Sequence, residues 1–134
     1  MTPGEAAVAA ARAAVGARFR LHGRLAATGL DCVGLAAVAL EAAGYRGEVP
    51  SGYALRSGDA ERVGEAIAMA GLVPAPEARA GDLLLLRAGA GQLHLAIWTG
   101  EGIVHADAML RRVVERPGAP PWPVLGRWRV VSEE

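Results

Sequence analysis

The chain has 134 residues, enough to bury an ordinary hydrophobic core, so we expect a single domain over residues 1–134. Its 14 acidic residues balance 14 basic residues, and this neutrality argues against nucleic acid or an anionic membrane as a partner. The single cysteine excludes an internal disulfide. The N-terminal stretch carries Glu5 and Arg12, unlike an export signal, and no apolar run is long enough to span a bilayer. We therefore expect a chain made in the cytoplasm without a signal peptide.

The first half of the sequence shows helical patterns. Helices are predicted at Pro3–Val15, Asp31–Ala43 and Asp59–Ala70, and loops between them at Gly16–Gly29 and Val49–Gly58. Thr2 is a suitable N-cap for the first helix, and Gly44 ends the second. The second helix is apolar on every side, which indicates that it lies in the middle of the domain.

The second half shows short runs typical of strands, at Leu83–Leu86, Leu93–Thr99, Ile103–Asp107, Arg111–Glu115 and Trp128–Val131. The letters "TGEG" between the second and third runs predict a hairpin. Trp122 lies in a proline-rich loop, where it either caps the core or meets a partner. Helices followed by strands predict an α+β domain, with N-terminal helices packed on an antiparallel sheet.

The only cysteine follows Asp31, a strong N-cap residue, so Cys32 is expected at the first helical position. There the unpaired backbone N–H groups and the helix dipole favour a thiolate. Gly34 in the first turn costs roughly 1 kcal/mol relative to Ala, which suggests a close approach to the backbone beside the sulfur or tight packing of the helix. The alternative for Cys32 is an inert side chain in the core.

A thiol nucleophile needs a base, and the base needs an orienting group. With the hairpin turn at Gly100–Glu101, Ala96 faces His105 and His94 faces Asp107. Because side chains alternate along a strand, the two histidines project from one face as diagonal neighbours, roughly 7–8 Å apart at the backbone. The sequence has no Asn, so the third group is His105 or Asp107. Alternatively, each histidine is only structural.

The motifs "GLDCVGL", "GDLLLL", "HLAIWTGEG" and "IVHA" occur in this order between Gly16 and Ala106 and resemble those of the NlpC/P60 cysteine peptidases. The resemblance implies a papain-like α+β fold, no cofactor and no metal. It also implies Cys32 as nucleophile, His94 as base and His105 as the polar third residue. The substrate would be a peptidoglycan stem peptide, cut between D-glutamate and the diamino acid. The N–H of Cys32 would then contribute to an oxyanion hole.

Val33, where many members of the family have Ser, and the short chain look most like the phage-tail and gene-transfer-agent branch. That branch implies tail proteins as partners and action in the periplasm after incorporation into a particle. Phe19 stands where the family commonly has Tyr, so a hydroxyl near the developing oxyanion is missing.

The segment around Phe19 supplies most of the other candidates for substrate binding. His22 faces either the cleft or solvent, and Arg18, Arg20 and Arg24 either bind carboxylates of an acidic stem peptide or form a solvated loop. The full predicted set is Phe19, Arg20, His22, Asp31, Gly34 and Asp107.

Three functions stay open. A peptidase predicts rapid alkylation of Cys32 by iodoacetamide at neutral pH. The missing hydroxyl leaves room for a structural, tail-associated adaptor without turnover. A third hypothesis is a zinc-binding module that uses Cys32, His94 and His105, since one sulfur and two imidazoles can bind zinc with a water.

Overall fold

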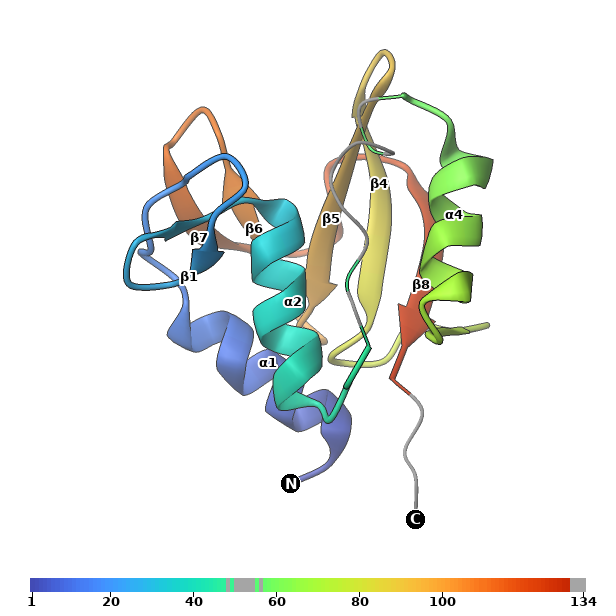
Figure 1. Ribbon diagram of the computed structural model, residues 1–134, viewed down its shortest axis with the longest axis horizontal. Helices are drawn as coiled ribbons and strands as arrows, with labels where there is room; N and C mark the ends of the chain where they lie inside the picture. Colours follow the sequence, from blue (N-terminus) through green and yellow to red (C-terminus); the bar gives the residue numbers. More distant parts are fainter. Residues whose placement is uncertain (48, 50–54, 56, 131–134) are drawn as a thin grey trace.

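The computed structural model describes residues 1–47, 49, 55 and 57–130 (Figure 1). Its helices are α1 (Pro3–Ala13), α2 (Cys32–Ala42) and α4 (Ala60–Met69). Its strands are β1 (Arg24–Leu25), β2 (Gly29–Leu30), β3 (Val73–Pro74), β4 (Leu83–Gly89), β5 (Gln92–Trp98), β6 (Gly102–Asp107), β7 (Arg112–Pro117) and β8 (Val124–Arg129). None of the helices in these described ranges is long and apolar enough to cross a membrane.

The strands of the second half form one six-stranded sheet, in the order β3-β8-β4-β5-β6-β7, and every pair of neighbours is antiparallel. Helices α1 and α2 lie together against β5 and β6, and α4 lies beside β8 (Figure 1). The predicted α+β architecture, with N-terminal helices on an antiparallel sheet, is confirmed.

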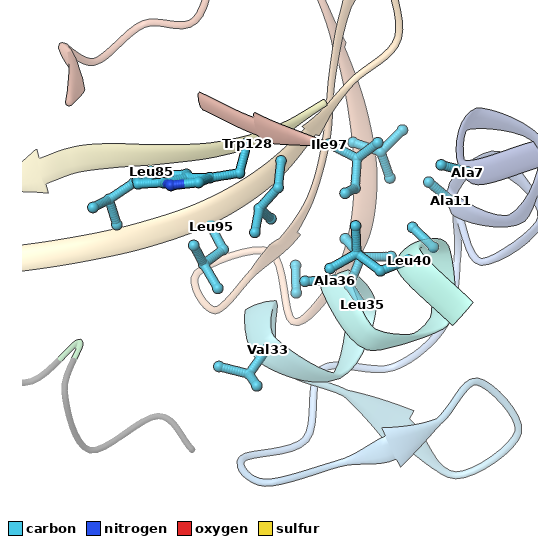
Figure 2. Close-up of a cluster of buried hydrophobic side chains, with 14 of the residues drawn as sticks. Ala7, Ala11, Val33, Leu35, Ala36, Leu40, Leu85, Leu95, Ile97 and Trp128 are labelled. Atoms are coloured by element: carbon cyan, nitrogen blue, oxygen red, sulfur yellow. The ribbon is translucent and has the colours of Figure 1, made fainter. Parts of the chain in front are cut away.

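The main core lies between α1, α2 and one face of the sheet (Figure 2). The helices contribute Ala7, Ala11, Leu35, Ala36 and Leu40, and the sheet contributes Leu83, Leu85, Leu95, Ile97, Val104 and Trp128. A second, smaller cluster consists of Leu84, Leu86, Ala96 and Ile103, with Trp98 and Trp122 packed against it. Because side chains alternate along a strand, this second cluster belongs to the other face of β4 and β5.

The predicted helix starts are confirmed. Thr2 caps α1 through a capping box with Glu5, in which the backbone N–H of Glu5 donates to Thr2 Oγ1 at 3.1 Å. Asp31 caps α2, so Cys32 occupies its first position. Gly44 follows the end of α2 with φ +100°, a left-handed conformation that favours glycine.

The hairpin between β5 and β6 has the expected register. Ile97 pairs with Val104 and Trp98 with Ile103, as a turn at Gly100–Glu101 requires. The ladder between these strands stops at the Ile97–Val104 pair, although both strands continue beyond it. The backbone pairing of the two strands therefore does not extend to the level of the histidines.

The "GDLLLL" motif has a structural role at the start of β4. The buried carboxylate of Asp82 accepts hydrogen bonds from Nε and Nη2 of Arg129, each at 2.9 Å, and from the backbone N–H of Arg79 at 2.8 Å. A paired and hydrogen-bonded carboxylate tolerates burial, and this one joins β4 to β8.

Parts of the irregular structure differ from the predictions. The segment Gly16–Gly29, expected as a loop, contains β1 and reaches into β2, and the last strand begins at Val124 rather than at Trp128. Two-residue strands are too short to show alternation, and Gly126 interrupts it in β8. Residues 48, 50–54 and 56 of the predicted loop Val49–Gly58 lie outside the described residues, as do residues 131–134.

Candidate active site

The carboxylate of Asp31 holds the start of α2 against the preceding loop. Its Oδ1 accepts hydrogen bonds from the N–H of Gly34 at 2.8 Å and from Nη1 of Arg24 at 2.9 Å, and its Oδ2 accepts one from the N–H of His22 at 2.8 Å. With three donors, this buried carboxylate is fully engaged within the protein. Asp31 therefore fixes the position of Cys32, the next residue, through the backbone.

Gly34 packs against the same loop. A methyl group at this position would overlap the carbonyl oxygen of Gly23. The close approach inferred from the sequence is therefore an approach of the chain's own backbone, and Gly34 is not among the residues that line the cavity described below.

The two histidines of β5 and β6 meet in a direct hydrogen bond. His94 Nε2 lies 3.0 Å from His105 Nδ1, and the rings are nearly perpendicular, with centroids 5.1 Å apart. The predicted placement on one face of the hairpin is thus observed. The hydrogen-bond partner of His94 is thus His105 and not Asp107. Oδ1 of Asp107 instead accepts hydrogen bonds from the N–H groups of Met109 and Leu110.

This hydrogen bond assigns roles to the ring nitrogens. It engages Nε2 of His94, so Nδ1 is the nitrogen left to accept a proton from another group. For Nδ1 to be unprotonated in a neutral ring, Nε2 must carry the proton and donate it to Nδ1 of His105. His105, which is buried, then holds its own proton on Nε2.

Cys32, His94 and His105 line the same open cavity. Trp98 donates its backbone N–H to the carbonyl of Asp82, directly before β4, so by alternation the N–H of Leu95 points toward β6. The backbone ladder with β6 has ended before Leu95, so the N–H of Leu95 is left to form a hydrogen bond with the sulfur of Cys32. The end of the ladder is thus what lets the helix start and the hairpin share one cavity.

The cavity raises the pKa of the thiol rather than lowering it. Burial is the largest cause and the negative charge of Asp31 adds to it, so the pKa of Cys32 is about 11 despite opposing backbone N–H groups, that of Leu95 foremost. The thiolate expected from the helix N-terminus is therefore wrong for the resting protein. Loss of hydration at the sulfur outweighs the effect of the helix N-terminus on the pKa of this thiol.

Both imidazoles are also held in their neutral forms. Burial lowers the pKa of His94 to about 4, and His105 lowers it further while Asp107 opposes the shift. Burial likewise lowers the pKa of His105, against the pull of Asp107. At neutral pH the site therefore rests as one thiol and two neutral imidazoles.

The predicted substrate-binding residues divide into two groups. Phe19, His22, Asp31 and Asp107 line the cavity, whereas Arg20 and Gly34 do not. His22 is exposed, with φ +62°, and its backbone N–H is bound by Asp31. Phe19 lines the cavity, and none of the described residues that line it carries a hydroxyl group.

The arginines near Phe19 do not face the cavity. Arg24 pairs with Asp31, and the backbone of Arg18 bridges to that of Arg112, at the end of the sheet. Neither they nor Arg20 is among the residues that line the cavity, so the structure gives no support to their predicted binding of substrate carboxylates.

Trp122 belongs to the site, although the sequence did not mark it. Its ring contacts both imidazoles, with centroids 5.7 Å from His94 and 5.5 Å from His105, and it lines the cavity. The sequence showed only an aromatic residue in a proline-rich loop. In the described part of the chain, no three His, Cys, Asp or Glu side chains form a cluster able to hold a metal ion.

Comparison with known proteins identifies solved structures of the same fold. NlpC1 from Trichomonas vaginalis matches with a TM-score of 0.71 and 18% identity over 96% of this chain, which spans only 44% of that protein's length. The NlpC/p60 domain of the peptidoglycan hydrolase SagA matches with a TM-score of 0.59 and 26% identity, over 85% of this chain and 88% of that domain.

The peptidoglycan hydrolase RipB from Mycobacterium tuberculosis matches with a TM-score of 0.61 and 22% identity, over 98% of this chain and 66% of that one. No protein-family model and no curated protein matches the sequence. The chain is therefore structurally similar to NlpC/P60 domains, and the predicted papain-like α+β fold is confirmed.

Proposed function

We propose that this protein is a cysteine endopeptidase that hydrolyses peptidoglycan stem peptides, at the bond between D-glutamate and the diamino acid. One observation carries the proposal: the hydrogen bond from His94 to His105 lies in the cavity that Cys32 also lines, at the start of a helix. A nucleophile, a base and an orienting group are the minimum for acyl transfer through a thioester.

The neutral resting state defines how the reaction begins. As Sγ of Cys32 attacks the scissile carbonyl carbon, Nδ1 of His94 takes the thiol proton, and the carbonyl oxygen becomes an oxyanion. The backbone N–H of Cys32, at the helix N-terminus, donates to that oxyanion. The imidazolium that forms on His94 is stabilised by the Nδ1 acceptor of His105 and by the nearby charge of Asp107.

The reaction ends with the proton returned. His94 gives it to the leaving amine as the C–N bond breaks, which leaves a thioester on Cys32 and releases the diamino acid portion. Water then attacks the thioester, His94 accepts a proton from that water, and the thiol is re-formed as the D-glutamyl carboxylate departs. Throughout, His105 keeps the ring of His94 in one orientation and one tautomer.

The test compares the protein with its Cys32→Ser variant on purified peptidoglycan, with fragments identified by mass spectrometry. We expect the unchanged protein to release fragments with a free amino group on the diamino acid, and the variant to release none. Identical fragments from both proteins, or none from the unchanged protein at high enzyme concentration, would contradict the proposal. Circular dichroism of the variant controls for its fold.

A non-catalytic adaptor is the second candidate, and Phe19 at the cavity is the observation that favours it. An adaptor would bind its partner yet release no fragments in the assay above. Association with a phage-tail or gene-transfer-agent particle, and action in the periplasm, remain proposals from the sequence. The zinc-binding alternative lacks a matching cluster among the described residues.

A further inference from the structure

Trp122 contacts the rings of both hydrogen-bonded imidazoles. Its ring makes edge contacts with His94 and His105, at interplanar angles of 78° and 81°. The rings of the two histidines are themselves 86° apart, so each of the three rings meets the other two nearly at right angles. This is a preferred geometry for aromatic pairs, and it leaves little freedom for either imidazole to rotate.

The loop that carries Trp122 is tied down at both ends. The N–H of Gly118 donates to the carbonyl of Glu101 at 2.7 Å, and the carbonyl of Pro123 accepts the N–H of Arg87 at 3.1 Å. Prolines at 120, 121 and 123 restrict the backbone further, because each fixes its own φ. The loop therefore presents the indole from a fixed point between the β5–β6 turn and β4.

We propose that Trp122 is a positioning residue, which locks the orientation of the His94–His105 pair and excludes water from their hydrogen bond. Its importance for catalysis rests on the proposed function, whereas its effect on the imidazoles does not. A hydrogen bond shielded from water is stronger and more directional than an exposed one. Without the indole, water competes for Nε2 of His94, and the ring can turn its Nδ1 away from the thiol.

Trp98 offers a matched control. It is half-buried like Trp122 and packs against the same apolar cluster of Leu84, Leu86, Ala96 and Ile103. Among the described residues, the ring contacts of the two histidines are with each other and with Trp122. If Trp122 served only to cover the cluster, equivalent substitutions of the two tryptophans would affect the imidazoles equally.

The experiment follows the imidazole resonances of the ¹⁵N-histidine-labelled protein by NMR between pH 3 and pH 8, without substrate. In Trp122→Leu, admission of water relieves the burial of His94, so its pKa rises from about 4 by at least one unit. In Trp98→Leu the pKa values of both histidines stay within about 0.3 units of those in the unchanged protein, because desolvation acts over short distances. Trp122→Phe keeps a ring in place and shows a smaller shift than Trp122→Leu.

Two outcomes would overturn the proposal: unchanged imidazole titrations in Trp122→Leu, or equal shifts in Trp122→Leu and Trp98→Leu. If Trp122→Leu does not fold, the Trp122→Phe and Trp98→Phe pair decides in the same way, through a shift in the former only. Because this measurement needs no turnover, it stands even if the protein cleaves no peptidoglycan. If it does cleave, Trp122→Leu should lower kcat at least tenfold with KM nearly unchanged.

Discussion

The raised pKa of Cys32 gives a quantitative prediction for its reactivity. At pH 7 an ordinary thiol with a pKa of about 8.5 is ~3% thiolate, whereas a pKa of about 11 leaves ~0.01%. That is roughly a 300-fold loss of the reactive form. A more basic thiolate is intrinsically more nucleophilic, with a Brønsted slope of about 0.4–0.5, which recovers ~10-fold. In place of the rapid alkylation expected from the sequence, we therefore expect Cys32 to react with iodoacetamide on the order of 30-fold more slowly than the same thiol in the unfolded chain.

The assay measures the pseudo-first-order rate of alkylation by mass spectrometry, from pH 6 to pH 10. The chain in urea supplies the reference thiol, and Cys32→Ser, which has no thiol, supplies the blank. The rate should rise by a factor of ten per pH unit over most of this range, because the thiolate fraction does so below the pKa. His94→Gln should change the neutral-pH rate little, since a neutral imidazole does not hold the thiolate.

A plateau of fast alkylation between pH 5 and pH 8 would refute this reasoning. It would mean that the thiol has already passed its proton to His94 and that the resting site is a thiolate–imidazolium pair. In that case removal of His94 would abolish the plateau. The same result would show that attraction between the two charges exceeds the cost of burying them.

Three further outcomes follow from the same contacts. Because the pKa of His94 is lowered in the folded state, its contribution to stability is present above pH 6.5 and is lost as the pH falls toward 4. Urea titrations at pH 7 and pH 4 should therefore show that the free energy of unfolding of the unchanged protein falls by ~3 kcal/mol more than that of His94→Gln. Gly34→Ala should destabilise the protein by about 1–3 kcal/mol, because its methyl group meets the carbonyl of Gly23. The control Gly64→Ala in α4 has ordinary room for a methyl group and should be neutral or stabilising by up to ~1 kcal/mol. Both effects are measured from urea midpoints, and equal effects would contradict the packing argument. Phe19→Tyr should raise the cleavage rate of an active peptidase by returning a hydroxyl to the cavity, and an unchanged rate in a fragment-release assay would show that this position does not face the oxyanion.

Local rules were sufficient for the elements that frame the site. Asp31 is an N-cap by its chemistry, so the sequence alone predicts that Cys32 opens a helix. The period of two along a strand, together with a short turn, determines which side chains of a hairpin share a face, so the meeting of His94 and His105 follows from the register. These are short-range relations, which do not depend on the rest of the fold. What the histidines do chemically stays a prediction.

Long-range relations could not be predicted in this way. Trp122 reaches the imidazoles from a loop with no periodicity, through hydrogen bonds to residues far away in the sequence, and no local pattern indicates where such a loop will lie. The prediction for the thiol pKa fails for the same reason. The sequence shows the helix N-terminus, which lowers the pKa of Cys32, but not the surroundings that bury the sulfur and raise that pKa. Sequence therefore predicts which groups meet more readily than it predicts their protonation. The order of proton transfer in a thiol–imidazole pair depends on that protonation. The last β5–β6 pair lies where it leaves the N–H of Leu95 to contact the sulfur. The position of that pair therefore affects the chemistry as directly as the identity of the three side chains does.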